Sequence, residues 1–301
     1  MPTCVAASTT WTSLPHCDDQ RQQIMGEIMP SETELLDSAC KFLEKRSELY
    51  NVVTSSPEFL ASGAQLYPYD IIEANFSIII DLLEKSSCFD FLSENGIGTV
   101  LDVGGANGDL AFVFAGAGFE TTLVDLSLSY QKSPLVASLI NLKLGANIRV
   151  IDFSVDGHFG YSDLLNQTVN LGQFTHKYHS GVFDLVICFG LFYHLKNPFA
   201  FLESVRRISR FCILGTWLMS YLPDNIIRVR DVSVAYFLGP GELNNDASNY
   251  WIFSESAFRR LVERAGFSIV SSASAFVRED KMSNPVDTNY GERGFLLLRS
   301  G

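Results

Sequence analysis

Glycines and acids in the middle of the chain have types and spacing that suit nucleoside binding. Gly104, Gly105 and Gly108 form a glycine-rich turn. The turn follows an apolar run, 99–103, and leads into a helical segment that begins near Asn107. Glycine lets the backbone approach a ligand closely, and the amino end of a helix favours a carboxylate or phosphate. The turn therefore predicts a ligand held by bare backbone.

Three acids accompany this turn. Asp102 lies within the apolar run, and Asp125 and Asp152 end the two apolar runs that follow. A carboxylate at the end of the second strand can accept both hydrogen bonds from a ribose diol. Because parallel strands end at one edge of a sheet, we expect these acids to line the edge where open α/β sheets bind ligands.

The elements that must position these residues alternate between strand-like and helical patterns, which predicts a parallel sheet covered by helices on both faces. Ser133 before Pro134, Asn197 before Pro198, and Ser254 are expected to cap three of the helices. The last two apolar runs have no helix between them and are predicted to pair antiparallel. The strand-like runs are 99–103, 121–125, 148–152, 183–188, 211–216, 268–272 and 294–298.

The preceding part of the chain divides into two segments. Residues 1–29 lack periodicity and are interpreted as a loose lead-in. A capping box at 31–34 then opens a helical extension over 30–95, with a second helical pattern from about residue 70 to 92. We expect these helices to lie over one end or edge of the main domain, 96–301.

Composition restricts the partners. The 301 residues include 34 Asp and Glu against 22 Lys and Arg, a formal net charge of -12. This balance offers no broad attraction to phosphate backbones or anionic lipid, so nucleic acid is a disfavoured partner.

The six cysteines form no Cys-x-x-Cys pair and predict no metal site. No apolar run reaches the roughly 18 residues of a membrane span, and a cytoplasmic protein is expected.

The segment 101–108, LDVGGANG, resembles the first motif of class I S-adenosylmethionine-dependent methyltransferases, with Ala106 in place of the usual middle glycine. The segments VDL at 124–126 and IDF at 151–153 resemble the second and third motifs. The resemblance covers about 97–299. It implies a Rossmann-like, mostly parallel seven-stranded sheet that a reversed hairpin completes, and S-adenosylmethionine as cofactor.

Carried over by position, the resemblance implies roles for the glycines and acids. Gly104 and Gly105 would pass under the methionine part of the cofactor, and Gly108 would complete the turn. Asp102 would anchor the turn, where it either contacts the cofactor directly or only satisfies N–H groups of the loop. Asp125 would hold the ribose hydroxyls.

The later motifs would complete the cofactor site. Asp152 would accept from the adenine amino group while Phe153 flanks the ring, and Gly190 would close over the methionine amino group. The run CFGL at 188–191 replaces an Asp/Asn-Pro-Pro-Tyr motif. The branch of the family that methylates adenine and amide nitrogens is therefore not expected.

Two residues after the fourth strand are candidates for catalysis. His194 is a candidate general base, since an imidazole titrates near neutral pH. The alternative is that it orients a loop. The segment 189–198 is similar to tRNA wobble-uridine carboxymethyltransferases and their uncharacterised bacterial relatives, in which the position of Tyr193 lies near an extra carboxylate of the donor. Packing is the alternative role for Tyr193.

The stretch between the fifth strand and the last helix is where this fold places acceptor recognition. Its arginines and aromatic residues favour an anionic or aromatic acceptor, and the alternative is an ordinary solvated loop. The candidates are Arg228, Arg230, Tyr236, Asn249, Tyr250 and Trp251.

The function predicted is methyl transfer from S-adenosylmethionine to an oxygen, nitrogen or carbon of a small-molecule acceptor. One alternative is transfer to a tRNA wobble uridine, which the net charge of -12 disfavours. A second is a non-catalytic scaffold that binds the cofactor. A third, a nicotinamide dehydrogenase, shares the turn and Asp125 but is disfavoured by Asp152 and by the run after the fourth strand.

Overall fold

The computed structural model describes residues 31–68, 71–84, 98–127, 132–165, 182–276 and 291–301. The predicted lead-in, 1–29, and the end of the second helical pattern, beyond residue 84, lie outside these ranges. Within them, no helix is both long enough and apolar enough to span a bilayer.

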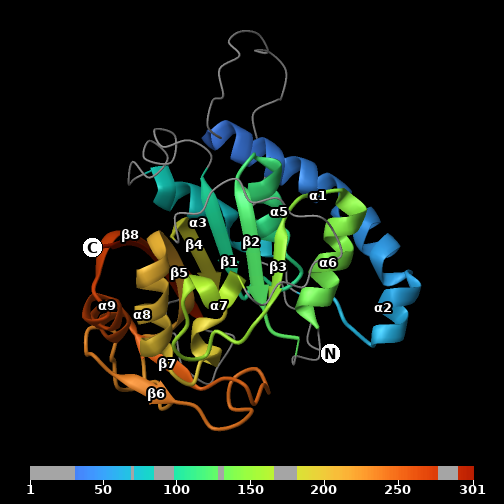
Figure 1. The fold of residues 1–301 in the computed structure, drawn as a ribbon. Helices are drawn as coiled ribbons and strands as arrows, with labels where there is room; N and C mark the ends of the chain where they lie inside the picture. Colours follow the sequence, from blue (N-terminus) through green and yellow to red (C-terminus); the bar gives the residue numbers. More distant parts are fainter. Residues whose placement is uncertain (1–30, 69–70, 85–97, 128–131, 166–181, 277–290) are drawn as a thin grey trace.

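A single sheet forms the centre of the molecule (Figure 1), as the alternating pattern predicts. Its first five strands are parallel and lie in the order β3-β2-β1-β4-β5. These strands are β1 Thr99–Val103, β2 Glu120–Asp125, β3 Arg149–Asp152, β4 Phe183–Phe189 and β5 Ser209–Met219.

The predicted antiparallel hairpin completes the sheet. β8 (Phe267–Phe276) pairs with β9 (Glu292–Ser300), and β9 runs antiparallel to β5. Two short strands that the sequence pattern does not predict, β6 (Ala235–Phe237) and β7 (Trp251–Ser254), extend the sheet to nine strands. β7 pairs with the last residues of β5, beyond the point where β4 ends.

Helices cover both faces of the sheet because residues along the strands alternate between two cores. In β4, Leu185 and Ile187 belong to one core, and Val186 and Cys188 belong to the other. The first core is closed by α1 (Glu32–Thr54), α3 (Ile71–Glu84), α5 (Asp109–Gly116) and α6 (Ser133–Leu144). The second is closed by α7 (Tyr161–Leu165), α8 (Pro198–Ile208) and α9 (Glu255–Arg264).

Helix boundaries follow the capping residues at most of the predicted positions. The Ser31–Glu34 capping box starts α1, Asn197 accepts from the Ala200 N–H, and Ser254 accepts from the Ala257 N–H. α6 differs, because Ser133 is its first residue and Lys132 occupies the cap position in a left-handed conformation.

We expected the N-terminal helices to lie over one end or edge of the main domain, but they form part of the layer that covers one face of the sheet. α1 packs against α5 and α6 (Figure 1), and α2 (Pro57–Ser62) follows it. The approach is close, since a Cβ on Gly116 would lie 2.3 Å from the Ser38 hydroxyl oxygen. The reason is that α5 is apolar on all sides, so its outer side also requires a cover.

Polar contacts tie α1 to the start of α5. The Tyr50 hydroxyl donates to the Asp109 carboxylate, and the Arg46 guanidinium lies 3.8 Å from it. Asn107 donates to the Tyr50 oxygen at 3.3 Å and to the Tyr67 carbonyl at 3.2 Å. Burial and Asp109 raise the pKa of Tyr50 well above its usual value, so this hydroxyl remains a donor.

We expect Tyr50→Phe to destabilise the protein, because the buried Asp109 carboxylate loses its hydroxyl donor. The free energy of unfolding should fall by about 1–3 kcal/mol, measured by chemical denaturation. Tyr221→Phe is the matched control, because no hydrogen bond of that hydroxyl occurs in the described part of the chain. Equal stability of the Tyr50 variant and the wild type would contradict this account.

Candidate functional site

The glycine turn after β1 adopts a conformation that side chains would obstruct. Gly104 has a φ of +70°, and its N–H donates to the Val124 carbonyl at 2.8 Å. A Cβ on Gly105 would lie 2.3 Å from the Asp102 carboxylate. Ala106, at the usual glycine position of the motif, also has a positive φ of 51°. The turn therefore has almost no side-chain atoms and lies directly above Asp102.

Asp125 connects this turn to β2. One carboxylate oxygen accepts from the Ala106 N–H at 2.9 Å and the other accepts from the Leu126 N–H at 2.6 Å. Burial raises the pKa of Asp125, and these two N–H groups oppose that effect. The carboxylate therefore lies beside the turn at the carboxyl edge of the sheet.

Asp102 is a buried carboxyl below the turn. Its Oδ2 has no hydrogen-bond partner among the described residues. Burial, together with the nearby Asp125 charge, raises the pKa of Asp102 to about 7. The structure thus places Asp102 where it supports the turn from inside.

Asp152 and Phe153 lie next to Asp125, as predicted. Asp152 is the register partner of Asp125 on the neighbouring strand, and it accepts from the Ser127 N–H at 2.9 Å. The Phe153 N–H donates to the Asp125 carbonyl at 2.9 Å. The Phe153 ring makes an edge contact with Phe159 at 6.2 Å between centroids.

Gly108 serves the packing of the turn. It has a φ of +90° and precedes α5, and its N–H donates to the Gly105 carbonyl at 2.8 Å. A Cβ there would lie 2.9 Å from the Phe112 ring. The constraint on Gly108 therefore arises from the interior of the protein.

The loop after β4 meets the glycine turn. A Cβ on Gly104 would lie 3.0 Å from the Leu191 side chain. Gly190 has a φ of +71°, and its N–H donates to the Gly215 carbonyl at 3.3 Å. The short helix η1 (Phe192–His194) follows, and its Tyr193 is buried. The glycine turn and the loop after β4 thus meet at one edge of the sheet.

The loop between β6 and β7, residues 238–250, holds His194 in one tautomer. Its Nδ1 lies 3.1 Å from the Ser248 carbonyl and 3.0 Å from the Ser248 hydroxyl, which donates to Asp246 at 2.6 Å. Since a carbonyl only accepts, Nδ1 carries the proton, and Nε2 keeps its lone pair. Burial lowers the pKa of His194, and the Asp246 charge opposes this shift. Ser248 and Asp246 are contacts that the sequence motifs do not reveal.

The two predicted acceptor arginines are engaged elsewhere. Arg230 forms ion pairs with Glu255 at 2.5 Å and with the buried Glu292 at 2.9 Å. Arg228 pairs with the exposed Asp231 at 3.2 Å. The structure does not bring these guanidinium groups to the glycine turn.

The other predicted acceptor residues mainly form contacts within β6, β7 and the loop between them. The Tyr236 hydroxyl donates to Glu242 at 2.7 Å, and the Asn249 amide donates to the Leu243 carbonyl at 2.9 Å. The Trp251 ring packs between Phe237 and Phe253. Tyr250 reaches the site, since its N–H donates to the Tyr193 carbonyl at 2.8 Å.

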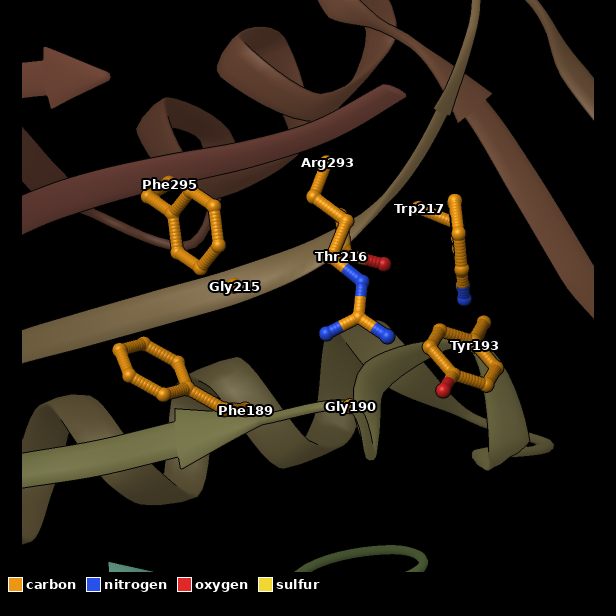
Figure 2. A pocket seen from close by; sticks show the side chains of 8 residues that line it. All are labelled: Phe189, Gly190, Tyr193, Gly215, Thr216, Trp217, Arg293 and Phe295. Atoms are coloured by element: carbon orange, nitrogen blue, oxygen red, sulfur yellow. The ribbon is translucent and has the colours of Figure 1, made fainter. Parts of the chain in front are cut away.

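A cavity with about 180 Å³ of empty space, part of it open to solvent, lies beside Gly190 (Figure 2). Most of the residues that line it could not be predicted to lie together, because they come from β5 and β9, which are distant in sequence. The lining residues are Phe189, Gly190, Tyr193, Gly215, Thr216, Trp217, Arg293 and Phe295.

Together, the parallel sheet, the bare turn and the acid at the end of β2 define a Rossmann-like fold, and open sheets of this kind bind ligands at the carboxyl edge. A family model described as a methyltransferase domain matches residues 71–272. The chain belongs to this family and is an S-adenosylmethionine-dependent methyltransferase. The described residues fit that cofactor, because residues 104–106 carry no side chain larger than a methyl group where the Asp125 carboxylate meets the turn.

Solved structures resemble this chain at low identity. A putative methyltransferase from Bacillus halodurans is 14% identical, with a TM-score of 0.48 and coverage of 71% of this chain and 97% of that chain. The magnesium protoporphyrin IX methyltransferase of Synechocystis, with bound SAH, is 14% identical, with a TM-score of 0.43 and coverage of 88% and 99%. The SAH-bound N-terminal domain of EvdMO1 is 16% identical, with a TM-score of 0.46 and coverage of 71% and 80%. No curated protein matches the chain.

We expect Asp102→Asn to stabilise the protein at pH 8. The folded-state pKa of Asp102 is about 7 against a usual value of 3.8, so its ionisation costs stability progressively as the pH rises between these values. Asparagine does not ionise, and the gain should reach at most about 4 kcal/mol above pH 7 and shrink towards pH 5.

The measurement is thermal unfolding at pH 5 and pH 8, with the exposed Asp231→Asn as the control. A difference in stability that does not change with pH would refute the role assigned to burial of this carboxyl.

Proposed function

We propose that the protein transfers a methyl group from S-adenosylmethionine to an oxygen, nitrogen or carbon of a small-molecule acceptor. The observation that carries this proposal is the meeting of two loops. The Gly104 backbone lies against Leu191, beside the Asp125 carboxylate and next to a cavity. Such an edge can hold a nucleoside on one side and an acceptor on the other.

In this proposal the turn and the acids hold the donor. The Gly104 and Gly105 backbone would lie under its methionine part, and Asp125 would accept from the ribose hydroxyls. Asp152, held by the Ser127 N–H, would accept from the adenine amino group, beside Phe153. Gly190 would lie over the methionine amino group.

When bound, S-adenosylmethionine supplies a methyl group that its sulfonium already activates. The protein then contributes mainly position, with a base only where the acceptor must lose a proton. We assign that base to His194, because its Nδ1 proton is held by Ser248 and its Nε2 lone pair can accept. Tyr193 would orient the acceptor from the wall of the cavity.

A second candidate is transfer to a tRNA wobble uridine from a carboxylated donor. The position of Tyr193 in the cavity wall favours it, and the net charge of -12 opposes it. A gel-shift titration with tRNA over a range of salt concentrations separates the two proposals. Saturable tRNA binding that weakens steeply with salt would favour the tRNA reaction.

Incubation with labelled donor and cell extracts tests catalysis itself. A labelled small molecule is the expected product. Binding of the cofactor with no transfer to any extract fraction would favour the scaffold alternative.

We expect Asp125→Ala to weaken binding of S-adenosylhomocysteine by at least about tenfold, because the ribose loses its acceptor and Ala106 loses its partner. Isothermal titration calorimetry measures the affinity, and circular dichroism reports whether the variant folds. Asp231→Ala is the control, because Asp231 is exposed and pairs with Arg228. Unchanged affinity of a folded Asp125 variant would overturn this placement of the ribose.

We expect the pKa of His194 to lie below 6.5 and to fall further in Asp246→Asn, by up to about one unit, because that variant removes the charge that raises it. Proton NMR titration of the imidazoles measures both values, and His194→Gln assigns the signal. Asp231→Asn is the control, because it removes an exposed carboxylate that pairs with Arg228 and not with Ser248. A higher pKa in Asp246→Asn would contradict the contact.

Once an acceptor is found, the rate of methyl transfer should fall as the pH drops through the pKa of His194. This acid limb should move to lower pH in Asp246→Asn.

A further inference from the structure

The short strand β6 forms one edge of the sheet (Figure 1), beyond β7. Its neighbouring residues pair with β7 at both ends. The Leu238 N–H donates to the Tyr250 carbonyl at 2.9 Å, and the Ser254 N–H donates to the Val234 carbonyl at 3.0 Å. Hydrogen-bonded pairs alternate along an antiparallel ladder, so Tyr236, midway between them, also directs its backbone groups to β7.

The two alternate residues of β6, Ala235 and Phe237, direct their N–H and C=O groups away from β7. Within the described ranges no second strand pairs with β6, and no hydrogen bond reaches these groups from another element. Both side chains are exposed, Phe237 at 64%. The strand therefore leaves two N–H and two C=O groups for pairing with another strand.

This edge lacks the residues that usually prevent such pairing. Exposed sheet edges commonly carry charged side chains or proline, whereas the segment 232–239, VSVAYFLG, has neither. Eight large apolar side chains are exposed in the described ranges, and four of them lie within 226–237. These four are Ile226, Ile227, Val232 and Phe237. The composition of the edge therefore favours contact with another protein surface.

The free backbone groups fit a second copy of the same strand. When two β6 strands run antiparallel about a two-fold axis at Tyr236, Ala235 of each copy lies opposite Phe237 of the other. These are the two residues with free backbone groups, so the pair forms four N–H to C=O hydrogen bonds and leaves none of these groups unpaired. The register also places a small side chain directly opposite each large ring.

Charge opposes association less at this edge than over the chain as a whole. A net charge of -12 makes two copies repel each other in general. The segment 226–239 has three charged residues, and all are paired. Arg230 is neutralised by two glutamates, and Arg228 pairs with Asp231 at 3.2 Å. The nearby Glu242 carboxylate accepts from the Tyr236 hydroxyl at 2.7 Å.

We propose that β6 is an interface through which two copies of this chain associate, with the strands antiparallel at Tyr236 and the two sheets joined into one. The proposal goes beyond the proposed function and does not depend on it. One short strand on each side makes a small interface, so the dissociation constant should be roughly 10–100 µM. Because β6 continues into the loop 238–250, which holds His194, association would also restrict that loop.

Sedimentation equilibrium of the full chain measures the association. Between about 1 and 200 µM, the mean mass should rise from that of one chain towards that of two. Hydrogen exchange followed by mass spectrometry should show slower exchange of the Ala235 and Phe237 amides at the high concentration than at the low one. Exchange at Tyr236 should change less, because its N–H is paired with β7 in both states.

Two variants remove the free edge while leaving the pairing with β7. Ala235→Pro deletes an outward N–H, and an edge strand tolerates proline where the N–H faces away from its neighbour. Phe237→Lys places a charge at the edge. Each should weaken association by at least about tenfold, with circular dichroism reporting that the variant folds. Leu60→Lys changes an equally exposed side chain on α2 and is the matched control, which should associate like the wild type.

A cross-link locates the axis. Tyr236 faces its own copy in a non-hydrogen-bonded pair, in which opposite side chains come close enough for a disulfide. Mild oxidation of Tyr236→Cys should therefore give a covalent dimer, and Leu60→Cys and the wild type under the same conditions should give much less.

Three results would overturn the interface. One is a wild type that remains a single chain at about 200 µM. Another is association that survives both Ala235→Pro and Phe237→Lys. The third is slow exchange of the Ala235 and Phe237 amides in the monomer at about 1 µM, which would mean that another part of this chain covers the edge. The affinity for S-adenosylhomocysteine is a separate measurement, and its absence in the wild type would count against the proposed function alone.

Discussion

The hydrogen bond from the Ala106 N–H to the Asp125 carboxylate is the contact on which the site depends, because it ties the glycine turn to the neighbouring strand. It brings Asp125 above the buried Asp102, and Asp152 is its register partner on β3. Burial and the Asp125 charge raise the pKa of Asp102, and burial and the Asp152 charge raise the pKa of Asp125. A site with this surplus of negative charge is complementary to a positively charged sulfonium compound, and the same charge discourages anions from the donor side.

The meeting of the glycine turn, Asp125 and Asp152 at one edge of the sheet could be predicted, because its sequence signals are local. A strand, a glycine turn and an acid at the next strand end are adjacent in the sequence, and parallel pairing brings them to one edge. The cavity beside Gly190 is different. Trp217 and Arg293 are direct neighbours across the antiparallel β5 and β9 pair, so only the strand register reveals their contact.

Charge type alone also fails to identify binding residues. Arg230 and Arg293 look equivalent in the sequence, yet Arg230 is neutralised by Glu255 and the buried Glu292, while Arg293 lines the cavity. The position of α1 was mispredicted for a related reason. Its amphipathic pattern predicts a helix but does not say which surface it covers. That surface is set by α5, which is apolar on all sides after Asp109.

The contacts between the first helix and the donor turn have a practical consequence for protein engineering. The family match begins at residue 71, after Tyr50 and Tyr67, and ends at residue 272, before β9. A fragment trimmed to those limits would lack the hydroxyl that binds Asp109, the backbone that binds Asn107 and the strand that carries Arg293. The smallest portable unit is therefore larger than the recognisable motif region, and chimeras that exchange acceptor preference should be joined outside it.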